Sequence, residues 1–309
     1  MSGWIERLRQ NTLRRKGRRL DKREEAGQVQ QWFLLAGRLP LAQAHAPDMA
    51  SLHCLYPPDD AFWADPFVWI RDGRTWVFFE DFCFATWRGH ISVIELGPDL
   101  QSLGPAVPVI REPYHLSYPF LFEYGGELYM LPEKCEVLKL EAYRCVEFPH
   151  RWEPVATLMD GVRIADATLL EHEGRWWLLG AVKQGRVRIN ESLFAFHADS
   201  PLSTTWTPHP ANPLVRDFAR GRPGGRVLRN TEGEWIRPSQ DCVRRYGHAL
   251  RFSRIDRLTP DAYAETPVGV VASDWRADIR ANHHWDWRDG VVVMDAQRLL
   301  PRERAGLGA

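Results

Sequence analysis

Apolar and polar residues alternate in short runs along most of the chain, and one pattern recurs at a nearly constant spacing. Residues 64–81 hold an apolar, aromatic run, a polar turn closed by Gly73, and a second aromatic run that ends in Glu80 and Asp81. Runs of aromatic and β-branched residues joined by a glycine turn are typical of β-hairpins. The stretch therefore predicts a strand, a tight turn and a second strand.

The same pattern occurs five times along the chain. The first residues of the five copies are Asp65, Tyr118, Asp166, Gly225 and His283. In the first four copies a turn glycine follows eight positions later, and in the fifth it follows seven positions later. The turn glycines, at 73, 126, 174, 233 and 290, lie 48 to 59 positions apart. Repeats of about 50 residues with several strands each are typical of propeller blades, so the chain is predicted to be an all-β, five-bladed β-propeller.

The rest of the chain is arranged around this ring. Residues 31–36 form a short apolar run, which we expect to be a strand that completes the last blade beside the fifth repeat. Residues 40–60 contain several prolines and are expected to form an irregular connection into the first blade. The predicted propeller spans residues 31–300, and the polar, glycine-rich residues 301–309 are predicted to be a flexible tail.

Residues 1–30 are predicted to be a basic helical extension. Nine arginine and lysine residues lie between Arg7 and Arg23, with fewer acidic residues and only a thin stripe of apolar positions. Charged segments of this kind are usually solvated or partly disordered. The alternative is a helix that touches anionic lipid headgroups or a partner, which would give the protein a peripheral contact with a membrane.

The composition excludes several classes of protein. Lysine plus arginine equals aspartate plus glutamate at 40 each, so no net charge favours nucleic acid as a partner. The five cysteines include no C-x-x-C pair, which argues against a disulfide framework or a zinc site, and a cytoplasmic location is expected. No apolar run reaches the length of about 18 residues that spans a bilayer. Trp63, Trp87 and Trp285 lie near strand ends, and we expect them to pack in the core rather than stack on a sugar.

The starts of the five repeats should meet in space. The innermost strands of all blades run in one direction, so their starts converge on one mouth of the central channel, which we call the funnel. Two carboxylates from different blades that face one funnel can act as acid and base when their surroundings separate their pKa values. Asp65 and Asp166 are therefore candidate catalytic residues, although a turn-capping role would also explain Asp65.

Further acidic residues lie where the second strands of the repeats end. Glu133 and Asp241 are candidate catalytic residues that would supply a proton. Glu80 and Asp81 are candidate substrate-binding residues. The structural alternatives are a solvated loop for Glu80 and Asp81 and a buried hydrogen bond for Asp241.

The remaining polar residues around the funnel are candidates for substrate binding. They are Tyr118, Arg222, His283 and His284. Arg222 would bind a phosphate or carboxylate in forked fashion, or form an ion pair with a neighbouring blade. Adjacent histidines on a strand point to opposite faces, and no third ligand is spaced to join them, so neither a metal nor a cofactor is expected.

Four motifs are long enough to compare with known families. They are FWADPF at 62–67, HLSYPFLFE at 115–123, YMLPE at 129–133 and RPSQDC at 237–242. Together they resemble the N-terminal domain of plant glucosamine inositolphosphorylceramide transferases and its stand-alone bacterial relatives, over about residues 55–295. That domain is similar in architecture to the five-bladed propeller glycosidases of the arabinanase, invertase and levansucrase type.

The resemblance to these glycosidases implies a funnel that faces carbohydrate. It implies that Asp65 is the base or nucleophile and that Asp166 orients it and tunes its pKa. Such glycosidases carry a glutamic acid proton donor at the start of the fourth blade, where this chain reads Arg-Pro-Gly-Gly-Arg at 222–226. Tyr118 also stands where some of them carry an aspartate. In the plant proteins the transfer chemistry is thought to lie in another domain.

These features predict a carbohydrate-directed propeller that acts in polysaccharide or glycolipid biosynthesis, by glycosyl transfer or glycosidic-bond chemistry in the funnel. The alternative is a non-catalytic glycan-binding or scaffolding propeller that works beside a separate glycosyltransferase. A third hypothesis is a protein-interaction ring without a ligand. The expected ligand is a glycan or a nucleotide-sugar. Whether the chain is an enzyme stays open, and a carboxylic acid within reach of Asp65 would favour catalysis.

Overall fold

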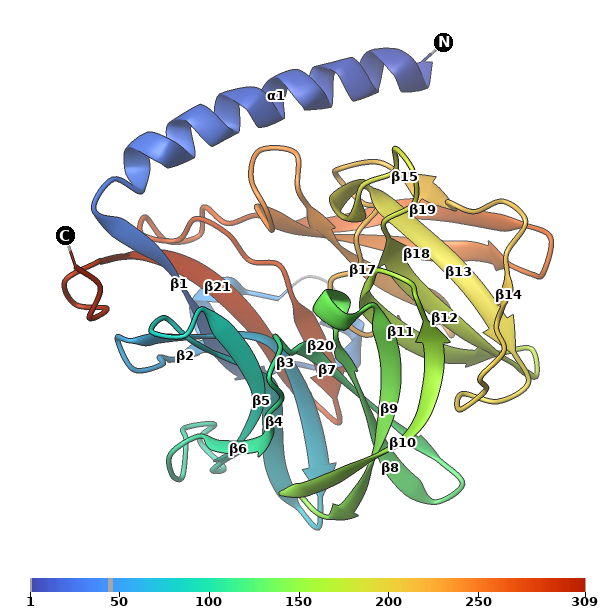
Figure 1. Cartoon of the computed structure of the whole chain (residues 1–309), viewed down its shortest axis with the longest axis horizontal. Coiled ribbons are helices and arrows are strands. Elements are labelled where there is room, and N and C mark those ends of the chain that lie inside the picture. The colour runs from blue at the N-terminus through green and yellow to red at the C-terminus, as the bar shows by residue number, and fades with distance from the viewer. Residues whose placement is uncertain (1, 44–46, 309) are drawn as a thin grey trace.

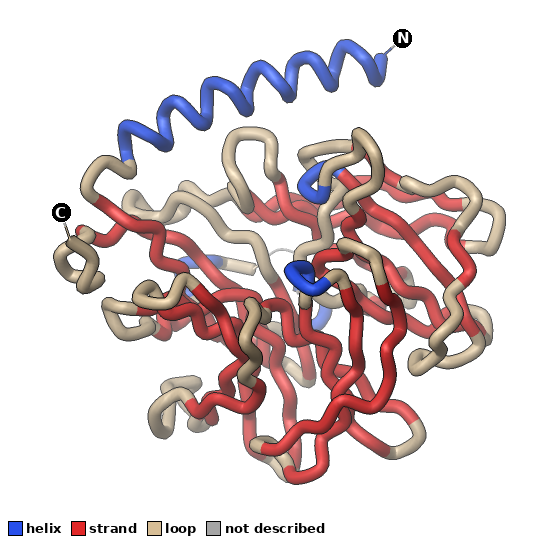
Figure 2. Tube along the Cα trace, in the orientation of Figure 1, coloured by secondary structure: helices blue, strands red, loops and turns tan. Residues whose placement is uncertain are grey.

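The computed structural model describes residues 2–43 and 47–308. Residues 1, 44–46 and 309, which belong to the predicted extension, connection and tail, lie outside the described residues. Five antiparallel sheets surround a common centre, as Figures 1 and 2 show. The chain is a five-bladed β-propeller, as the repeats predicted, and its described part contains one α-helix.

The first three blades follow one another along the chain, each starting from its innermost strand. Blade one contains β3 (Ala61–Arg71), β4 (Arg74–Cys83), β5 (Arg88–Leu96) and β6 (Val107–Ile110). Blade two contains β7 (Ser117–Tyr124), β8 (Glu127–Glu133), η3 (Cys135–Val137), β9 (Lys139–Glu147) and β10 (Arg151–Asp160). Blade three contains β11 (Ile164–His172), β12 (Arg175–Val182), η4 (Ile189–Glu191), β13 (Ser192–Ala198), β14 (Thr207–Pro208) and β15 (Val215–Arg216).

The last two blades complete the ring. Blade four contains β16 (Leu228–Arg229), β17 (Trp235–Asp241), β18 (Ala249–Leu258) and β19 (Tyr263–Val271). Blade five contains β20 (Trp285–Arg288), β21 (Val291–Pro301), β1 (Gln28–Arg38) and β2 (His53–Leu55), in that order across the sheet. The connection after β1 carries two short 3₁₀ turns, η1 (Leu41–Gln43) and η2 (Met49–Ser51).

The first strand closes the ring. β1 pairs antiparallel with β21 along its whole length, from Gln28 opposite Pro301 to Arg38 opposite Val291. The expectation that the N-terminal strand completes the last blade is therefore confirmed. Phe33 and Leu35 on β1 are fully buried, so the closure is held by apolar packing as well as by backbone hydrogen bonds.

Tryptophans near the strand ends divide into two groups. Trp63 and Trp285 are buried, as expected of side chains that fill the space between blades. Trp87, however, is 62% exposed, in the loop between β4 and β5. Its ring contacts Phe82 and Phe84, which form a small aromatic group with it. The expectation of core packing was wrong for Trp87, because this residue lies in a loop and leaves most of its surface in solvent.

The N-terminal helix α1 (Ser2–Glu24) is fixed to the propeller (Figure 1). Its acidic residues Asp21 and Glu24 form ion pairs with Arg245 and Arg280, which belong to the fourth and fifth blades' loops. At Gly17 the helix comes so close that an added Cβ would lie 1.9 Å from the carbonyl oxygen of Arg244. The predicted helix is present: Gln10 and Gly17 are buried against the propeller, whereas Arg15, Arg19 and Arg23 are exposed, as expected of a solvated segment.

The described residues that follow β21 fold back onto the molecule. Arg304 pairs with Asp59, and Ala305 is buried. This segment was predicted to be a flexible tail, and whether it moves independently of the propeller stays a prediction. Within residues 2–43 and 47–308, no helix has both the length and the apolar character needed to cross a bilayer.

The contact at Gly17 generates the first prediction. Gly17→Ala should release α1 from the propeller, although alanine is the better helix former, because the new methyl group overlaps backbone at Arg244. Trypsin should then cut the arginine-rich helix about tenfold faster, which corresponds to ~1.4 kcal/mol of lost docking. Thr12→Ala, on an exposed position of the same helix, is the control and should leave the cleavage rate unchanged. Equal cleavage rates for both variants would contradict the docking.

Candidate functional site

In each of the first three blades, the hydrogen-bond ladder between the innermost strand and its neighbour is interrupted near its start. The pairing of β3 with β4 skips the two residues between Ala64 and Phe67, and equivalent shifts occur in β7 and β11. The first residues of these bulges are Asp65, Tyr118 and Asp166, with φ of 52°, 46° and 53°. Left-handed backbone is uncommon outside glycine, and bulges re-aim side chains. The repeated bulge turns these three side chains toward the funnel.

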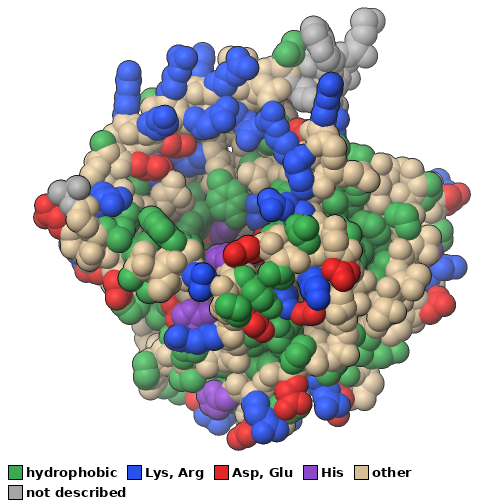
Figure 3. Space-filling view, viewed as in Figure 1, with side chains coloured by type: hydrophobic (Ala, Val, Ile, Leu, Met, Phe, Trp, Pro, Cys, Tyr) green, Lys and Arg blue, Asp and Glu red, His purple; other side chains and the backbone are tan. Residues whose placement is uncertain are grey.

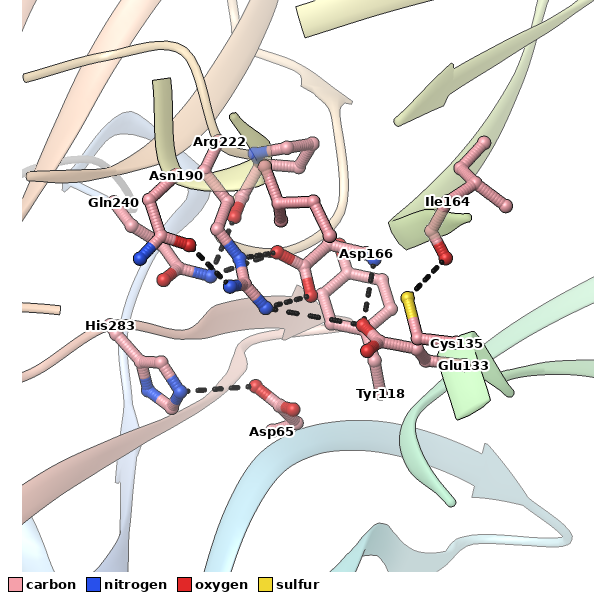
Figure 4. A network of polar contacts seen from close by, with 12 residues as sticks. Asp65, Tyr118, Glu133, Cys135, Ile164, Asp166, Asn190, Arg222, Gln240 and His283 are labelled. Atoms are coloured by element: carbon pink, nitrogen blue, oxygen red, sulfur yellow. Dashed lines mark hydrogen bonds and ion pairs between the residues drawn. The ribbon is translucent and has the colours of Figure 1, made fainter. Parts of the chain in front are cut away.

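Asp166 is held in a buried ion pair. Arg222 donates from Nε to its Oδ2 at 2.5 Å and from Nη2 to its Oδ1 at 3.1 Å, and Gln240 Nε2 donates to Oδ2 at 3.0 Å. The backbone N–H of Asp166 donates to Glu133 Oε2 at 3.1 Å. Figure 4 shows this network, in which Arg222 also reaches Asn190. Because Arg222 is engaged on both edges, it acts as the inter-blade ion pair and not as a free anion-binding fork.

Asp65 lies on the other side of the same group of residues, beside His283 (Figure 4). His283 Nε2 and His284 Nδ1 each lie 3.5 Å from Asp65 Oδ1. His283 Nδ1 lies 2.8 Å from Oδ2 of Asp295, whose carboxylate also accepts the backbone N–H of Asp65 at 3.0 Å. Asp295 is fully buried in β21, so it joins the start of blade one to the start of blade five.

The surroundings of these groups shift their pKa values in opposite directions. Burial disfavours the charge on Asp65, but the charge of His283 and the hydrogen bond from His284 outweigh it and lower the pKa of Asp65. Burial also opposes the charge on His283, but Asp295 outweighs it and raises the pKa of the imidazole. The surroundings therefore favour the charged form of His283 and of Asp65.

Two glutamates in the funnel have raised pKa values, in contrast to Asp65. Burial, followed by repulsion from Asp166, raises the pKa of Glu133 to about 8. Burial, followed by repulsion from Asp65, raises the pKa of Glu80 well above its ordinary value. Asp65 contributes to the upward pKa shift of both glutamates. The funnel thus holds an aspartate with a lowered pKa and a glutamate, Glu133, with a pKa of about 8, and such a separation suits general acid–base chemistry.

Asp65 and Asp166 face the same space. The pKa of the Tyr246 hydroxyl is raised by burial first, and both Asp65 and Asp166 raise it further. The Tyr246 ring contacts the His283 ring, and Cζ of Arg222 lies over the Tyr246 ring, 5.0 Å from its centroid. Tyr246 is nevertheless 37% exposed. Figure 3 shows a hollow in this face, bordered by the basic side chains of α1. Tyr246 therefore connects the buried carboxylates to the surface.

The histidine pair differs from the sequence-based expectation. Residues 282–284 precede β20 and are not in a strand, so both rings turn toward Asp65 instead of pointing to opposite faces. Asp65, His283 and Asp295 each offer one ligand atom, and these atoms lie within 4.8 Å of one another. This group contains His283 but not His284, and the expectation that no metal binds here stays a prediction. A metal ion at this trio would compete with a proton for His283.

Three further candidates do not reach the funnel network. Tyr118 is fully buried, and its hydroxyl bonds Thr168 and the backbone N–H of Gly225, so it ties blades together. Asp81 accepts hydrogen bonds from Trp63 and Ser92 within blade one. Asp241 accepts from Arg251. These three residues make structural contacts, and the substrate-binding or catalytic roles expected of them stay predictions.

The start of blade four has no room for an acid. Gly225 has φ of 130° and bridges to Trp285 in a parallel arrangement, and an added Cβ would lie 1.8 Å from the Trp285 carbonyl oxygen. At Gly224 an added Cβ would lie 2.9 Å from the carbonyl oxygen of His283. The missing fourth-blade glutamate is therefore a consequence of close backbone packing between blades four and five.

Sequence reasoning missed Gln240 and Asp295. Gln240 follows the turn glycine Gly233 by seven positions, as Glu80 follows Gly73 and Glu133 follows Gly126. This shared step was a signal that Gln240, and not Asp241, faces the funnel, because neighbouring strand residues point to opposite faces. Asp295 lies within an otherwise apolar strand, and an acidic residue in such a strand indicates a buried carboxylate.

Comparison with known proteins supports the resemblance that the motifs carried. A family model described as "Glucosamine inositolphosphorylceramide transferase 1, N-terminal" matches residues 50–304. Glucosamine inositolphosphorylceramide transferase 1 of Oryza sativa subsp. japonica is 34% identical over 260 residues, which cover 79% of this chain and 34% of that protein. The Arabidopsis thaliana protein of the same name is 36% identical over 238 residues, which cover 73% and 30%. The chain thus spans about a third of the length of these relatives.

Solved structures with the same fold are glycoside-processing enzymes. An exo-β-1,3-galactanase of Clostridium thermocellum superimposes with a TM-score of 0.55 and 10% identity, covering 86% of this chain and 64% of that one. An endo-1,4-β-xylanase of Bacteroides thetaiotaomicron gives a TM-score of 0.50 and 13% identity, covering 68% and 77%. At such low identity the likeness shows the five-bladed fold alone.

The raised pKa of Glu133 makes stability depend on pH. Between its ordinary value of 4.5 and about 8, the folded protein keeps a proton on Glu133 that the unfolded chain releases. The free energy of unfolding should therefore fall as pH rises through this window, and Glu133→Gln should flatten that fall by on the order of a few kcal/mol. Urea unfolding between pH 5 and about 8.5 measures it, with exposed Glu127→Gln as the control. A fall of the same steepness in Glu133→Gln would disprove the assignment.

The close contact at Gly225 leads to a separate prediction. Gly225→Ala should lower the free energy of unfolding by about 2–4 kcal/mol, because its φ is unfavourable for alanine and its Cβ would overlap Trp285. Gly104→Ala, where an added Cβ meets nothing, should stay within about 0.5 kcal/mol of the parent. Urea unfolding, or soluble yield if Gly225→Ala does not accumulate, measures the difference. Equal stability of the two variants would show that blade four can accept a side chain here.

Proposed function

The chain belongs to the family of the glucosamine inositolphosphorylceramide transferase 1 N-terminal domain, and on that premise we propose that its funnel binds a carbohydrate and acts on a glycosidic or glycosyl-phosphate bond. The observation that supports this most is the separation of two pKa values in one funnel. Asp65 is ionised at neutral pH, whereas the pKa of Glu133 is raised to about 8. A carboxylate and a carboxylic acid side by side are what glycosyl chemistry uses.

In this proposal the two carboxyl groups divide the proton transfers between them. Glu133 gives its proton to the leaving oxygen as the bond from that oxygen to the anomeric carbon breaks. Asp65 takes a proton from the incoming water or acceptor hydroxyl, whose oxygen forms the new bond to the anomeric carbon. Asp166, held by Arg222 and Gln240, places the Glu133 carboxyl through its backbone N–H and raises the pKa of that carboxyl.

A second candidate function is glycan binding without turnover, beside a separate glycosyltransferase. The close packing at Gly225 favours it, because the position of the glycosidases' proton donor is closed. The near-complete burial of Asp65, which is 4% exposed, favours it too, since a reacting bond must reach that carboxylate. In this version Tyr246 and the exposed Trp87 would supply aromatic faces for a sugar. Both versions assign the protein to polysaccharide or glycolipid assembly.

Ligand screening with three variants separates these functions. Oligosaccharides and nucleotide-sugars are tested for binding by calorimetry and for turnover by mass spectrometry of the products. If the funnel is catalytic, Asp65→Asn and Glu133→Gln should each lower turnover by about 10²–10⁴-fold. Asp241→Asn is the matched control, because this carboxylate lies on the same strand as Gln240 and bonds Arg251 instead. It should leave affinity and turnover unchanged.

The outcomes of this screen are distinct. A sugar that binds the parent protein, is not converted and loses affinity in Asp65→Asn would replace the enzyme by the binding module. Turnover that survives both funnel variants would place the chemistry elsewhere. Absence of any sugar ligand across the panel would reject both functions and leave a protein-interaction ring.

A further inference from the structure

The surface of α1 that faces away from the propeller is strongly basic. Four exposed side chains there have no acidic partner in the described part of the chain: Arg15, Lys16, Arg19 and Arg23. Figure 3 shows lysine and arginine side chains gathered along this helix. The acidic residues of the helix lie on its other side, where Asp21, Glu24 and Glu25 bind Arg245 and Arg280. The outer face of α1, defined by Arg15, Lys16, Arg19 and Arg23, thus keeps only positive charge, and the exposed Arg18 and Lys22 border it on the side of the propeller.

This distribution of charge differs from that of a helix that is merely solvated. Solvated helices gain from opposite charges three or four positions apart, and like charges at that spacing are destabilising. Arg15, Arg19 and Arg23 follow one another at four-residue steps on the outer face, so they repel. An anionic surface placed against this face would remove that repulsion.

Exposed leucines accompany the basic residues. Leu8, Leu13 and Leu20 are 48%, 41% and 42% exposed. Leu13 and Leu20 are seven positions apart and therefore lie on the same side of the helix. Leucines beside basic residues fit a helix that lies in the headgroup region of a bilayer, where the side chains enter the boundary of the acyl chains. A nucleic acid would pair with the charges but would leave the leucines in water.

We propose that the outer face of α1 binds the surface of a membrane that contains anionic lipids. The helix is already docked, so the binding face needs no refolding. A groove of about 290 Å³, lined in part by Arg18, Lys22 and Tyr246, runs between the helix and the funnel mouth. The bound protein would therefore hold its funnel mouth beside the bilayer.

Vesicle flotation tests this proposal with the full chain. The protein should float with vesicles of phosphatidylcholine mixed with phosphatidylglycerol but not with phosphatidylcholine alone, and added sodium chloride should weaken the binding. The triple variant Arg15→Glu/Arg19→Glu/Arg23→Glu should bind about 100-fold more weakly, since each basic residue contributes to attraction by the anionic surface. Arg144→Glu/Lys183→Glu/Arg257→Glu changes the net charge equally at exposed propeller positions and should retain binding.

Two further measurements keep the outcome clear. Leu13→Ser/Leu20→Ser leaves every charge in place and should weaken vesicle binding several-fold. Thermal unfolding and circular dichroism verify that each variant keeps the folded propeller and its helix. Equal loss of binding in both triple variants, or equal binding to phosphatidylcholine alone, would overturn the proposal. So would duplex RNA binding that is lost in the α1 variant while vesicles are not bound at the same salt concentration.

Discussion

The carboxylate of Asp295 is the contact on which the rest of the funnel depends. It is fully buried in β21 and accepts the backbone N–H groups of Asp65, His283 and His284. A buried charge is costly unless it is paired and hydrogen-bonded, and His283 supplies the pairing charge. Asp295 can meet these partners only because β1 pairs with β21 and closes the ring. Ring closure and the electrostatics of the hub are therefore one constraint.

The buried ion pair of Asp166 with Arg222 has the same physical reason, because a buried charge needs an opposite charge beside it. Asp166 is neutralised by Arg222, which crosses from the fourth blade to the third. The burial of Glu133 and Glu80 is not offset in this way, because Arg222 lowers the pKa of Glu133 by less than burial raises it, and burial lowers the pKa of His115, which lies 3.4 Å from Glu80. The pKa of Asp65 and the pKa values of the two glutamates consequently shift in opposite directions. In the funnel, a carboxyl that is paired with a cation favours its ionised, basic form, and a carboxyl without such a partner favours its protonated, acidic form.

The closed start of blade four and the docked helix show how this chain departs from a simple propeller glycosidase. Close backbone packing at Gly225 removes the side chain that would carry a proton donor there, and leaves Glu133 as the acid nearest the network. The helix, in turn, uses its acidic residues to hold the propeller and leaves its basic residues outside. Both features follow from contacts between segments that are far apart in the chain.

The sequence by itself determined the five hairpins and the ring, because strand period and turn glycines are local signals that recur in every blade. Only the tertiary structure decided that Gln240 and not Asp241 faces the funnel, since a shift of one residue reverses a strand side chain. It also decided the partners of Asp295, Arg222 and α1. These partners lie on other blades, and their pairing depends on how the whole ring closes.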